Sequence, residues 1–594
     1  MLKALRFAAA LAYAVSGTAR AETASDLVVG SVRDRSGAVI DGAQIRALDA
    51  SGRTLGSDRT DAEGTFAIRL PANAQTIEVR CPHCDPTRVR VANASELVVV
   101  VRRYAALESD VPAAADLAAL PYPRIVDALG LIPFTLVAGD AISDRGLGGG
   151  TGLIVDDGAP LVDLATGSPS LVDFPDRYVR SVAVSRAADA FRYGIDAGGG
   201  RFSLDQLDGD ASSASTDVGA ESSLTLEPAL GVVHPSYGVS SDGGTLTRRG
   251  DLDVATPFAG GFLRAGAGTG LFRASDDLAR NVDLARIAYA TASRRYRTAF
   301  DLSASRGGVA DRTSDSSNYH SAYLAANVRV EHPGPVSLAF GATATQRSAF
   351  YAPLRSGDDL TGRVAAKTLY AEANTGNERV RLRAGVGATD VTANETLASS
   401  DPSGERLSLL PAVSVRASLG AGAYVRGGFS EALRVPSLLE SDAAVPARSL
   451  ALERDELSES ALGFDRGRVR AEATVFRQFR HGFAQTRLDG IGASVAWQIA
   501  PLVSVRAWSL HDAPLDYVVA APSAANASRQ IVWATYGNGE GLRFDAIAHR
   551  DAGSGHGALG VDGDAFVPVA AHVALDVGTS VRDVRKYYFG LRAR

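Results

Sequence analysis

The chain has few cysteine, methionine and tryptophan residues: 2, 1 and 3 among 594. After the N-terminus it also lacks any run of eighteen apolar residues, which excludes a membrane-spanning helix. Its formal net charge of −6 is not the positive balance of a nucleic-acid-binding protein. The nine histidines are scattered, without an H-x-H or H-x-x-x-H pair. We find no nucleophile–base pair and no set of metal ligands. We therefore predict a protein that is not an enzyme and has no catalytic residues, metal site or cofactor.

The first residues have the pattern of an export signal. Lys3 and Arg6 precede an apolar run from Phe7 to Val15, and Ala19-Arg20-Ala21 fits a cleavage site. We predict that residues 1–21 are a signal peptide, because an anchoring helix would need a longer apolar run. With a mean hydropathy of +0.01, two classes stay compatible with the rest of the chain: a soluble protein, or a membrane barrel whose apolar signal is hidden in alternation.

Short strand-like runs follow, separated by turn signals, which is typical of a small β-sandwich. These runs are Leu27–Val32, Ala43–Ala47, Phe66–Leu70, Thr76–Arg80, Arg88–Val91 and Leu97–Val101. The successive patterns G-x-V-x-D-x-x-G, D-G-A and T-D-x-x-G-x-F resemble carboxypeptidase regulatory-like domains. The resemblance implies a module without catalytic residues, of the kind that often precedes the plug of TonB-dependent receptors. We assign residues 22–102 to it.

Cys81 and Cys84 are the only cysteines, in a C-P-H-C sequence between two of these runs. An exported protein meets an oxidising compartment, so we expect a local disulfide. The motif also resembles that of thioredoxin-like oxidases, but their chemistry needs a thiolate at a helix N-terminus. Metal binding or redox chemistry stays as the alternative.

The stretch from Arg145 to Leu204 is rich in glycine and resembles the plug domain of TonB-dependent outer-membrane receptors. A phosphate-binding loop is the alternative, but no Gly-Lys-Ser/Thr follows the glycines. The matching positions are Arg145, Gly146, Asp157, Gly158, the strand from Val179 to Arg186, Tyr193, Gly194 and Gly199. Ala187 stands where the family has glycine. We expect the plug to span residues 122–208.

From about residue 209 to 594 the chain alternates apolar and polar residues over segments of about ten. Val413, Val415, Ala417 and Leu419 alternate with polar neighbours, for example. An apolar–polar alternation with a period of two residues indicates strands with lipid on one side and a polar interior on the other. Tight turns also alternate with longer polar loops. We predict an antiparallel transmembrane β-barrel, and the family resemblance implies 22 strands. The fold class is thus mainly β: a small sandwich, a plug and a barrel.

A second resemblance lies within the barrel, where residues 429–438 and 452–464 are similar to the Y-S-x-x-F-R-x-P-S-L and L-x-P-E-x-S-x-x-Y-E-L-G-L segments of these receptors. The resemblance implies that plug arginines pair with glutamates of the barrel wall. We therefore expect Arg145 and Arg186 to pair with Glu459 or Glu472.

Residues 103–121 are rich in alanine and are expected to form a linker. The family carries a TonB box before its plug, which adds as a strand to TonB. The one candidate is Glu96, Leu97, Val98, Val99 and Val100, and the alternative is that these residues form the last strand of the sandwich.

The resemblance implies a cell-outer-membrane importer that takes up a scarce, bulky solute, an iron–siderophore complex first, with cobalamin, another chelated metal or a glycan as alternatives. Its partners would be TonB with the inner-membrane energising complex, outer-membrane lipid and the extracellular solute, with no nucleic acid. Solute contacts are expected at Tyr319, His320, Tyr351 and Tyr517, although aromatic residues at strand ends also form membrane girdles. A structural or adhesive plugged barrel without transport is the competing class.

Overall fold

The structure is a computed structural model of the 594-residue chain. It describes residues 27–34, 43–50, 53–60, 65–70, 74–80, 87–90, 96–101, 129–138, 141–144, 153–156, 159–161, 181–185, 187–205, 213–219, 221–227, 233–242, 245–258, 261–273, 278–292, 296–311, 318–332, 336–352, 360–376, 379–395, 403–435, 452–466, 468–481, 486–500, 502–513, 528–537, 542–552, 558–570, 573–581 and 585–593. The signal peptide, the linker and both cysteines lie outside these ranges.

The N-terminal part consists of two packed sheets. One has the order β4-β1-β7 and the other β3-β2-β5-β6. Their bounds are β1 Leu27–Asp34, β2 Gln44–Leu48, β3 Thr54–Arg59, β4 Thr65–Arg69, β5 Thr76–Arg80, β6 Thr87–Arg90 and β7 Glu96–Val101. Alternate residues of both sheets, including Ile45, Phe66, Ile77 and Val99, form one buried apolar cluster. The sequence misses β3, because TLGSDR has no alternation of apolar and polar residues.

Glu78 of β5 lies on the outer face of the second sheet, with its side chain 1% exposed. Arg46, Arg80 and Arg88 surround its carboxylate at 3.1, 2.8 and 2.8 Å. Burial opposes the charge of Glu78, but the hydrogen bonds and positive charges of Arg80 and Arg88 prevail and lower its pKa below the usual value.

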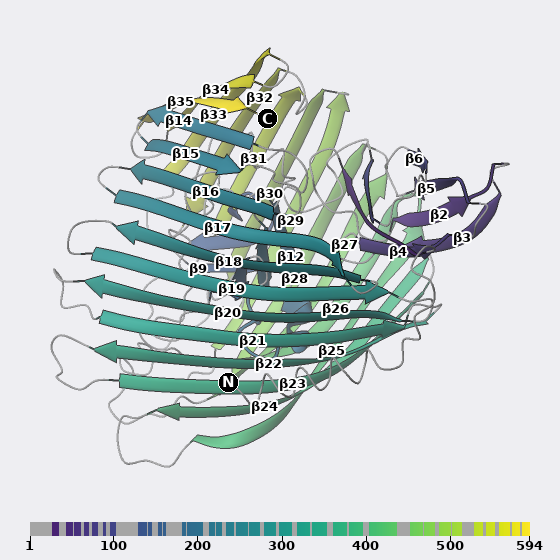
Figure 1. Ribbon diagram of the computed structural model, residues 1–594, viewed down its shortest axis with the longest axis vertical. Coiled ribbons are helices and arrows are strands. Elements are labelled where there is room, and N and C mark those ends of the chain that lie inside the picture. The colour runs from purple at the N-terminus through teal and green to yellow at the C-terminus, as the bar shows by residue number, and fades with distance from the viewer. Residues whose placement is uncertain are drawn as a thin grey trace.

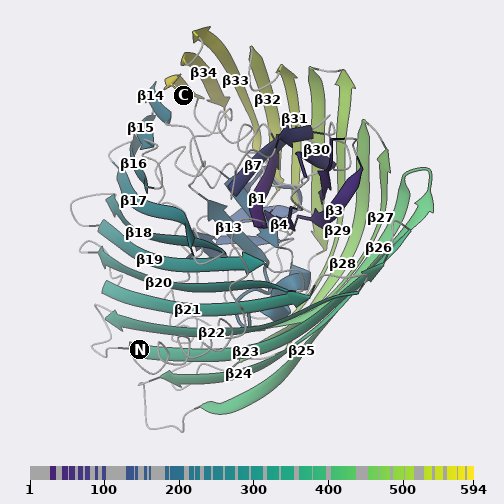
Figure 2. The ribbon, with the colours of Figure 1, turned by 45° about the vertical axis from the view of Figure 1, so that its right-hand side comes forward.

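The second part lies inside the barrel wall. It contains the hairpin β8 (Thr135–Ala138) with β9 (Ala141–Asp144), and a sheet of order β11-β10-β13-β12. The strands of this sheet are β10 Leu153–Asp156, β11 Ala159–Pro160, β12 Ser181–Ser185 and β13 Arg201–Asp205, and a 3-10 helix, η3, spans Ala187–Arg192. We call residues 129–205 the plug. Figure 1 shows β9 and β12, and Figure 2 shows β13, within the ring of barrel strands.

The third part is one closed antiparallel barrel whose strands run in chain order from β14 to β35. The bounds are β14 Ser213–Gly219, β15 Glu221–Glu227, β16 Val233–Asp242, β17 Thr245–Phe258, β18 Gly261–Arg273, β19 Leu278–Ala292, β20 Arg297–Asp311, β21 Asn318–His332, β22 Val336–Ala352, β23 Leu360–Gly376, β24 Val380–Glu395, β25 Ser403–Gly420, β26 Ala423–Arg434, β27 Glu453–Arg466, β28 Val469–His481, β29 Thr486–Ala500, β30 Val503–Ala513, β31 Ser528–Gly537, β32 Arg543–Ala552, β33 Ala558–Ala570, β34 Val573–Val581 and β35 Arg585–Ala593. The first strand pairs with the last from Ala214↔Ala593 to Gly219↔Tyr588, which closes the ring.

The predicted phase of the barrel strands is confirmed. In β25, Leu409, Val413, Val415 and Leu419 are exposed while Leu410 is buried, so the apolar row faces outward. Many strands exceed the expected ten residues, and β25 has 18. Their outer ends continue the hydrogen-bonded ladder past the apolar belt, as in β20, which continues to Asp311.

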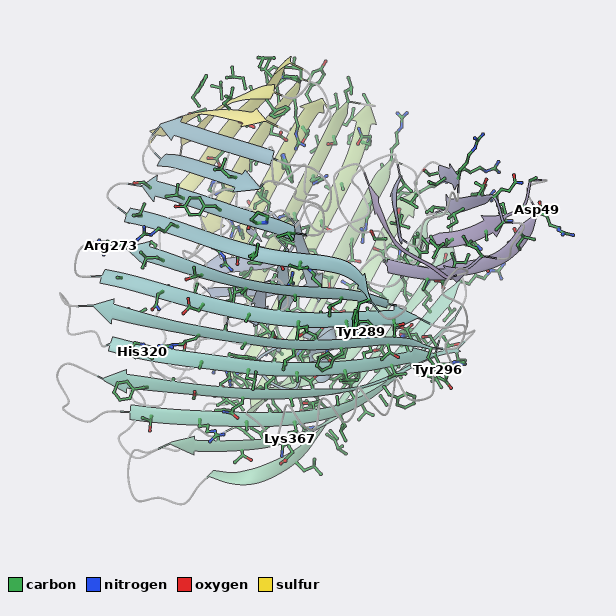
Figure 3. The ribbon with its side chains drawn as sticks, in the orientation of Figure 1. Asp49, Arg273, Tyr289, Tyr296, His320 and Lys367 are labelled. Carbon is green, nitrogen blue, oxygen red and sulfur yellow. The ribbon has the colours of Figure 1, made fainter. Side chains whose placement is uncertain are left out.

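The two ends of the barrel differ. Connections such as Ala421–Gly422 are short at the end where β17, β19 and β21 finish, and the longest, from Arg434 to Glu453, lies at the opposite end. Exposed aromatic side chains gather near the short-connection end: Phe258, Tyr296, Phe340, Phe464, Trp497, Tyr536 and Phe544. Figure 3 labels Tyr289 and Tyr296 there and His320 at the other end. In Figure 1 the sandwich projects beyond the short-connection end. Among the described residues, no helical segment has the length and apolar character needed to cross a membrane.

Candidate functional site

The candidate site is the interface between the plug and the inner face of the barrel. On one side it is apolar. Plug residues Leu129, Ile132, Phe134, Ile154 and Phe202 pack against the barrel in one buried cluster. The barrel residues of this cluster are Leu457, Phe476, Trp508, Leu510, Ile531, Trp533 and Ile547, from β27 to β32.

Trp508 of β30 anchors this apolar side. Its ring meets Phe134 edge-on, with 6.3 Å between the ring centroids. Its indole Nε1 donates a hydrogen bond of 3.2 Å to the carbonyl oxygen of Leu131. Gly492 of β29 leaves room for Phe134, because a Cβ there would come within 2.6 Å of the ring. Aromatic packing and one directional bond thus fix the plug against β29 and β30.

On the other side of the plug, η3 inserts Phe191 into the wall. The ring packs with Val364, Tyr370 and Leu410 of β23 and β25 in a second buried cluster. Gly387 of β24 permits this approach, since a Cβ there would lie 2.5 Å from the carbonyl oxygen of Phe191. Glycine in this strand is therefore a packing requirement.

Arg192, the last residue of η3, pairs with Glu372 of β23, whose side chain is fully buried. Arg192 Nε donates to the carboxylate at 2.8 Å, and barrel residues Arg383 and Asn374 donate to its other oxygen, each at 2.8 Å. Thr343 of β22 also donates to the carbonyl oxygen of Arg192 at 3.0 Å. Charge-assisted bonds of this kind are directional, so they fix the position of η3.

Asp196 makes the most concentrated set of plug–barrel contacts. Its carboxylate forms an ion pair with Arg347 of β22 at 2.6 Å, and the two side chains are only 9% and 2% exposed. Its backbone N–H donates to the carbonyl oxygen of Leu433 at 2.8 Å, and its Oδ1 accepts from the N–H of Val435 at 3.3 Å. Ile195 forms a parallel bridge with Leu433. We call residues Arg192 to Asp196 the latch.

The local backbone explains why the latch can reach the wall. Gly194 and Asp196 have φ of 83° and 63°, in the left-handed region. Glycine adopts this region freely, and aspartate is among the few other residues that tolerate it. The two turns present Ile195 and Asp196 to β26 as a short added strand.

The predicted plug motif includes part of this latch. Tyr193 and Gly194 belong to it, and Gly199, which is buried, lies five residues after Gly194. The sequence did not single out Arg192, Asp196, Glu372 or Arg347. For Arg192 and Asp196, the sequence signal that could have identified them is their position beside the Tyr193-Gly194 pair.

The plug–barrel ion pairs predicted from the sequence involve residues of which the structure describes only the barrel partners. Glu459 and Glu472 both bind Arg426 of β26, at 2.6 and 2.7 Å. Arg145 and Arg186 lie outside the described residues, as do Gly146, Asp157 and Gly158. The pairing therefore stays a prediction.

The structure places the TonB-box candidate, Glu96 to Val100, in β7. This strand pairs in parallel with β1, from Val29↔Glu96 to Asp34↔Val101, and Val99 is fully buried. The residues thus occupy the position that the alternative interpretation gives them, the last strand of the sandwich.

Of the predicted solute contacts, His320 is exposed on the outward face of β21. This location does not support contact with a solute inside the barrel. Tyr319 and Tyr351 are opposite each other on β21 and β22, with only their backbones described, and Tyr517 lies outside the described ranges. In the part of the chain that the structure describes, no group of three or more His, Cys, Asp or Glu side chains is arranged to hold a metal ion.

Comparison with known proteins agrees with this architecture. Residues 28–102 match the carboxypeptidase regulatory-like domain family. No curated protein matches the sequence. Among solved structures, the chain is similar to the alcaligin outer-membrane receptor FauA from Bordetella pertussis, with a TM-score of 0.63, 12% identity, and 79% of this chain and 91% of that chain covered.

Two further similar structures are the siderophore receptor PirA from Pseudomonas aeruginosa and the FrpB iron transporter from Neisseria meningitidis. Their TM-scores are 0.63 and 0.64 at 14% and 11% identity. Each comparison covers 81% of this chain and 98% of the other. The predicted fold class, mainly β with a small sandwich, a plug and an antiparallel barrel, is confirmed.

Proposed function

We propose that the chain is a TonB-dependent outer-membrane importer, in which the barrel spans the membrane and the plug is the gate. The observation that carries the proposal is the buried latch. Arg192 and Asp196 fasten the plug to the wall through ion pairs with Glu372 and Arg347. Such pairs hold the plug strongly in one position, and their attraction weakens as the charges are moved apart.

For the cargo we propose a metal chelate, with an iron–siderophore complex first. The support is the three similar structures described above, which include a siderophore receptor and an iron transporter. Their identities of 12%, 14% and 11% carry the fold alone, so the choice of cargo needs its own test. The same gate would also serve the import of cobalamin or of a glycan, which are the alternative cargoes.

A second candidate, a structural or adhesive barrel with a fixed plug, is favoured by one observation. The TonB-box candidate is paired within the sandwich through β7, and a paired strand is not available to add to TonB. On the importer proposal, TonB must engage either a released β7 or another periplasmic segment of the chain.

Iron uptake with a lockable plug distinguishes the two candidates. The variant Ile195→Cys/Leu433→Cys places a cysteine pair across the latch bridge, where adjacent Cα atoms are close enough for a disulfide. The control Leu462→Cys/Ala473→Cys joins two neighbouring wall strands, β27 and β28. The hosts are cells that lack their own siderophore receptors, with and without TonB, supplied with radioactive iron bound to a panel of siderophores.

The importer predicts TonB-dependent accumulation by the unmodified protein and by the control pair. It predicts loss of accumulation on oxidising the latch pair and recovery after reduction. Accumulation that persists with the latch oxidised would contradict the gate. Correctly folded protein that accumulates none of these iron–siderophore complexes, and in parallel assays neither labelled cobalamin nor labelled glycans, would favour the fixed plug.

A further inference from the structure

The barrel has a basic pocket on its outward face, away from the plug. Its volume is about 520 Å³. Its lining, from the adjacent strands β20 to β23, includes Arg306, His320, Ala322, Ser348, Phe350 and Arg363.

The strand register explains why a hollow forms there. Arg306 is opposite Ala322, Ala322 is opposite Ser348, and Ser348 is opposite Arg363. This row thus has an arginine at each end and two small residues between them. Three steps of about 4.8 Å separate the arginine Cα atoms by about 14 Å. His320 and Phe350 form part of the next row and border the hollow.

Alternation along the strands shows which way the pocket faces. Ala349 and Val364 are buried with Phe191 of the plug, so they point into the barrel. Ser348 and Arg363 are their immediate neighbours and therefore point outward. Arg306, His320 and Arg363 are all exposed.

The same alternation shows where the pocket lies relative to the apolar belt of the barrel. Between His320 and His332, the outward positions of β21 are all apolar: Ala322, Leu324, Ala326, Val328 and Val330. Twelve residues of a tilted strand cover about 30 Å of barrel height, which is the apolar belt with one polar boundary at each end. His332 lies against Tyr296 at the aromatic end, with ring centroids 5.4 Å apart. His320 lies at the other boundary, at the long-connection end (Figure 3).

Among the residues that the structure describes, no carboxylate balances the charge of the pocket. Arg363 Nη2 donates to Gln346 Oε1 at 3.1 Å, a neutral partner. Within the described ranges, neither Arg306 nor Arg363 forms an ion pair with a carboxylate. Elsewhere on the outward face, by contrast, Asp489 lies 2.6 Å from Arg477. At the edge of the hydrocarbon region an anionic partner stabilises an arginine, and the planar guanidinium group suits a phosphate.

We propose that this pocket binds the phosphorylated headgroup of an outer-leaflet glycolipid. The inference rests on the proposed membrane orientation of the barrel. A lipid is favoured over free phosphate because the apolar row of Ala322 and Leu324 continues from the pocket into the belt, where acyl chains lie. The two arginines would hold phosphate groups, and His320 and Phe350 would border the sugar.

Native mass spectrometry of the full chain in dodecyl maltoside micelles tests the proposal without requiring transport. The probes are diphosphoryl lipid A, dephosphorylated lipid A and inorganic phosphate. We compare the unmodified protein with Arg306→Ala/Arg363→Ala. The control Arg248→Ala/Arg550→Ala removes two exposed outward arginines near the same barrel end but outside the pocket. Circular dichroism verifies that each barrel is folded.

We expect one tightly bound diphosphoryl lipid A per chain. In the pocket variant its binding should be about 30-fold weaker, because each basic residue near an anionic lipid surface contributes about fivefold. The control should bind within about threefold of the unmodified protein. Equal loss in both variants, equal binding of dephosphorylated lipid A, or displacement of the lipid by millimolar phosphate would overturn the proposal. Each result leaves the importer proposal unaffected, since uptake is not measured.

Discussion

Replacing Asp196 by asparagine removes one charge from the latch and changes little else. Asparagine has the same shape, tolerates a φ of 63°, and can still accept the hydrogen bond from Val435. The ion pair with Arg347 is lost. At 2.6 Å and an effective dielectric constant of about 20, the attraction between the two charges is about 6 kcal/mol, partly offset by their desolvation. Because Arg347 would be left buried without its partner, we expect plug docking to weaken by about 3–5 kcal/mol.

Hydrogen exchange of the plug amides measures this effect. A loss of 3 kcal/mol in the stability of docking should raise the exchange of the latch amides by about 100-fold or more, while the barrel strands serve as an unchanged reference. Asp489→Asn is the matched control. It breaks the exposed ion pairs of Asp489 with Arg477 and Arg487 and should cost about 1 kcal/mol or less. A change below tenfold in the latch, or equal changes in both variants, would refute the claim that this pair holds the plug.

Three further outcomes are expected. The depressed pKa of Glu78 stabilises the sandwich above about pH 4.5, and this contribution is lost as the pH falls through the lower folded-state pKa. Exchange of the β5 amides should therefore rise with acid, and Glu78→Gln should flatten that rise; parallel profiles would contradict it. Gly387→Ala should displace Phe191 and raise exchange in η3, whereas Gly250→Ala, whose nearest new contact would be 3.7 Å away, should not. Brominated lipid should quench Trp497, which is 49% exposed, and spare the other two tryptophans, which are 4% and 3% exposed; quenching of all three would contradict the assignment of the outer face.

The sequence predicted the barrel because lipid and lumen impose opposite demands on neighbouring residues. The outward row of β25, with Leu409, Val413 and Val415, is visible without coordinates for that reason. The strand ends were less visible. Beyond the apolar belt both faces meet water, so alternation fades although the hydrogen-bonded ladder continues, as it does in β20 to Asp311.

In the sandwich, by contrast, the sequence failed to predict one whole strand, β3. Six of its seven strands match predicted runs, and each of these runs contains β-branched or aromatic residues. β3 was missed because Thr54–Arg59 lies at the edge of its sheet and has a glycine at its centre. Its pairing with β2, from Gln44↔Arg59, comes from the sheet that β2 and β5 provide. Tertiary context thus overrides weak local preference.

The latch could not be predicted because its partners are chemically ordinary within the barrel. Residues that face the lumen are polar whether they meet water or the plug, so Glu372 and Arg347 look like any other inward charge. Arg192 and Glu372 are 180 positions apart, and no spacing rule connects them. The family motif marks the backbone that the latch needs, through Tyr193-Gly194, because left-handed turns restrict which residues can occur. The wall imposes no such restriction on its side of the contact. A sequence motif can therefore identify one half of this plug–barrel contact, and only the fold identifies the other.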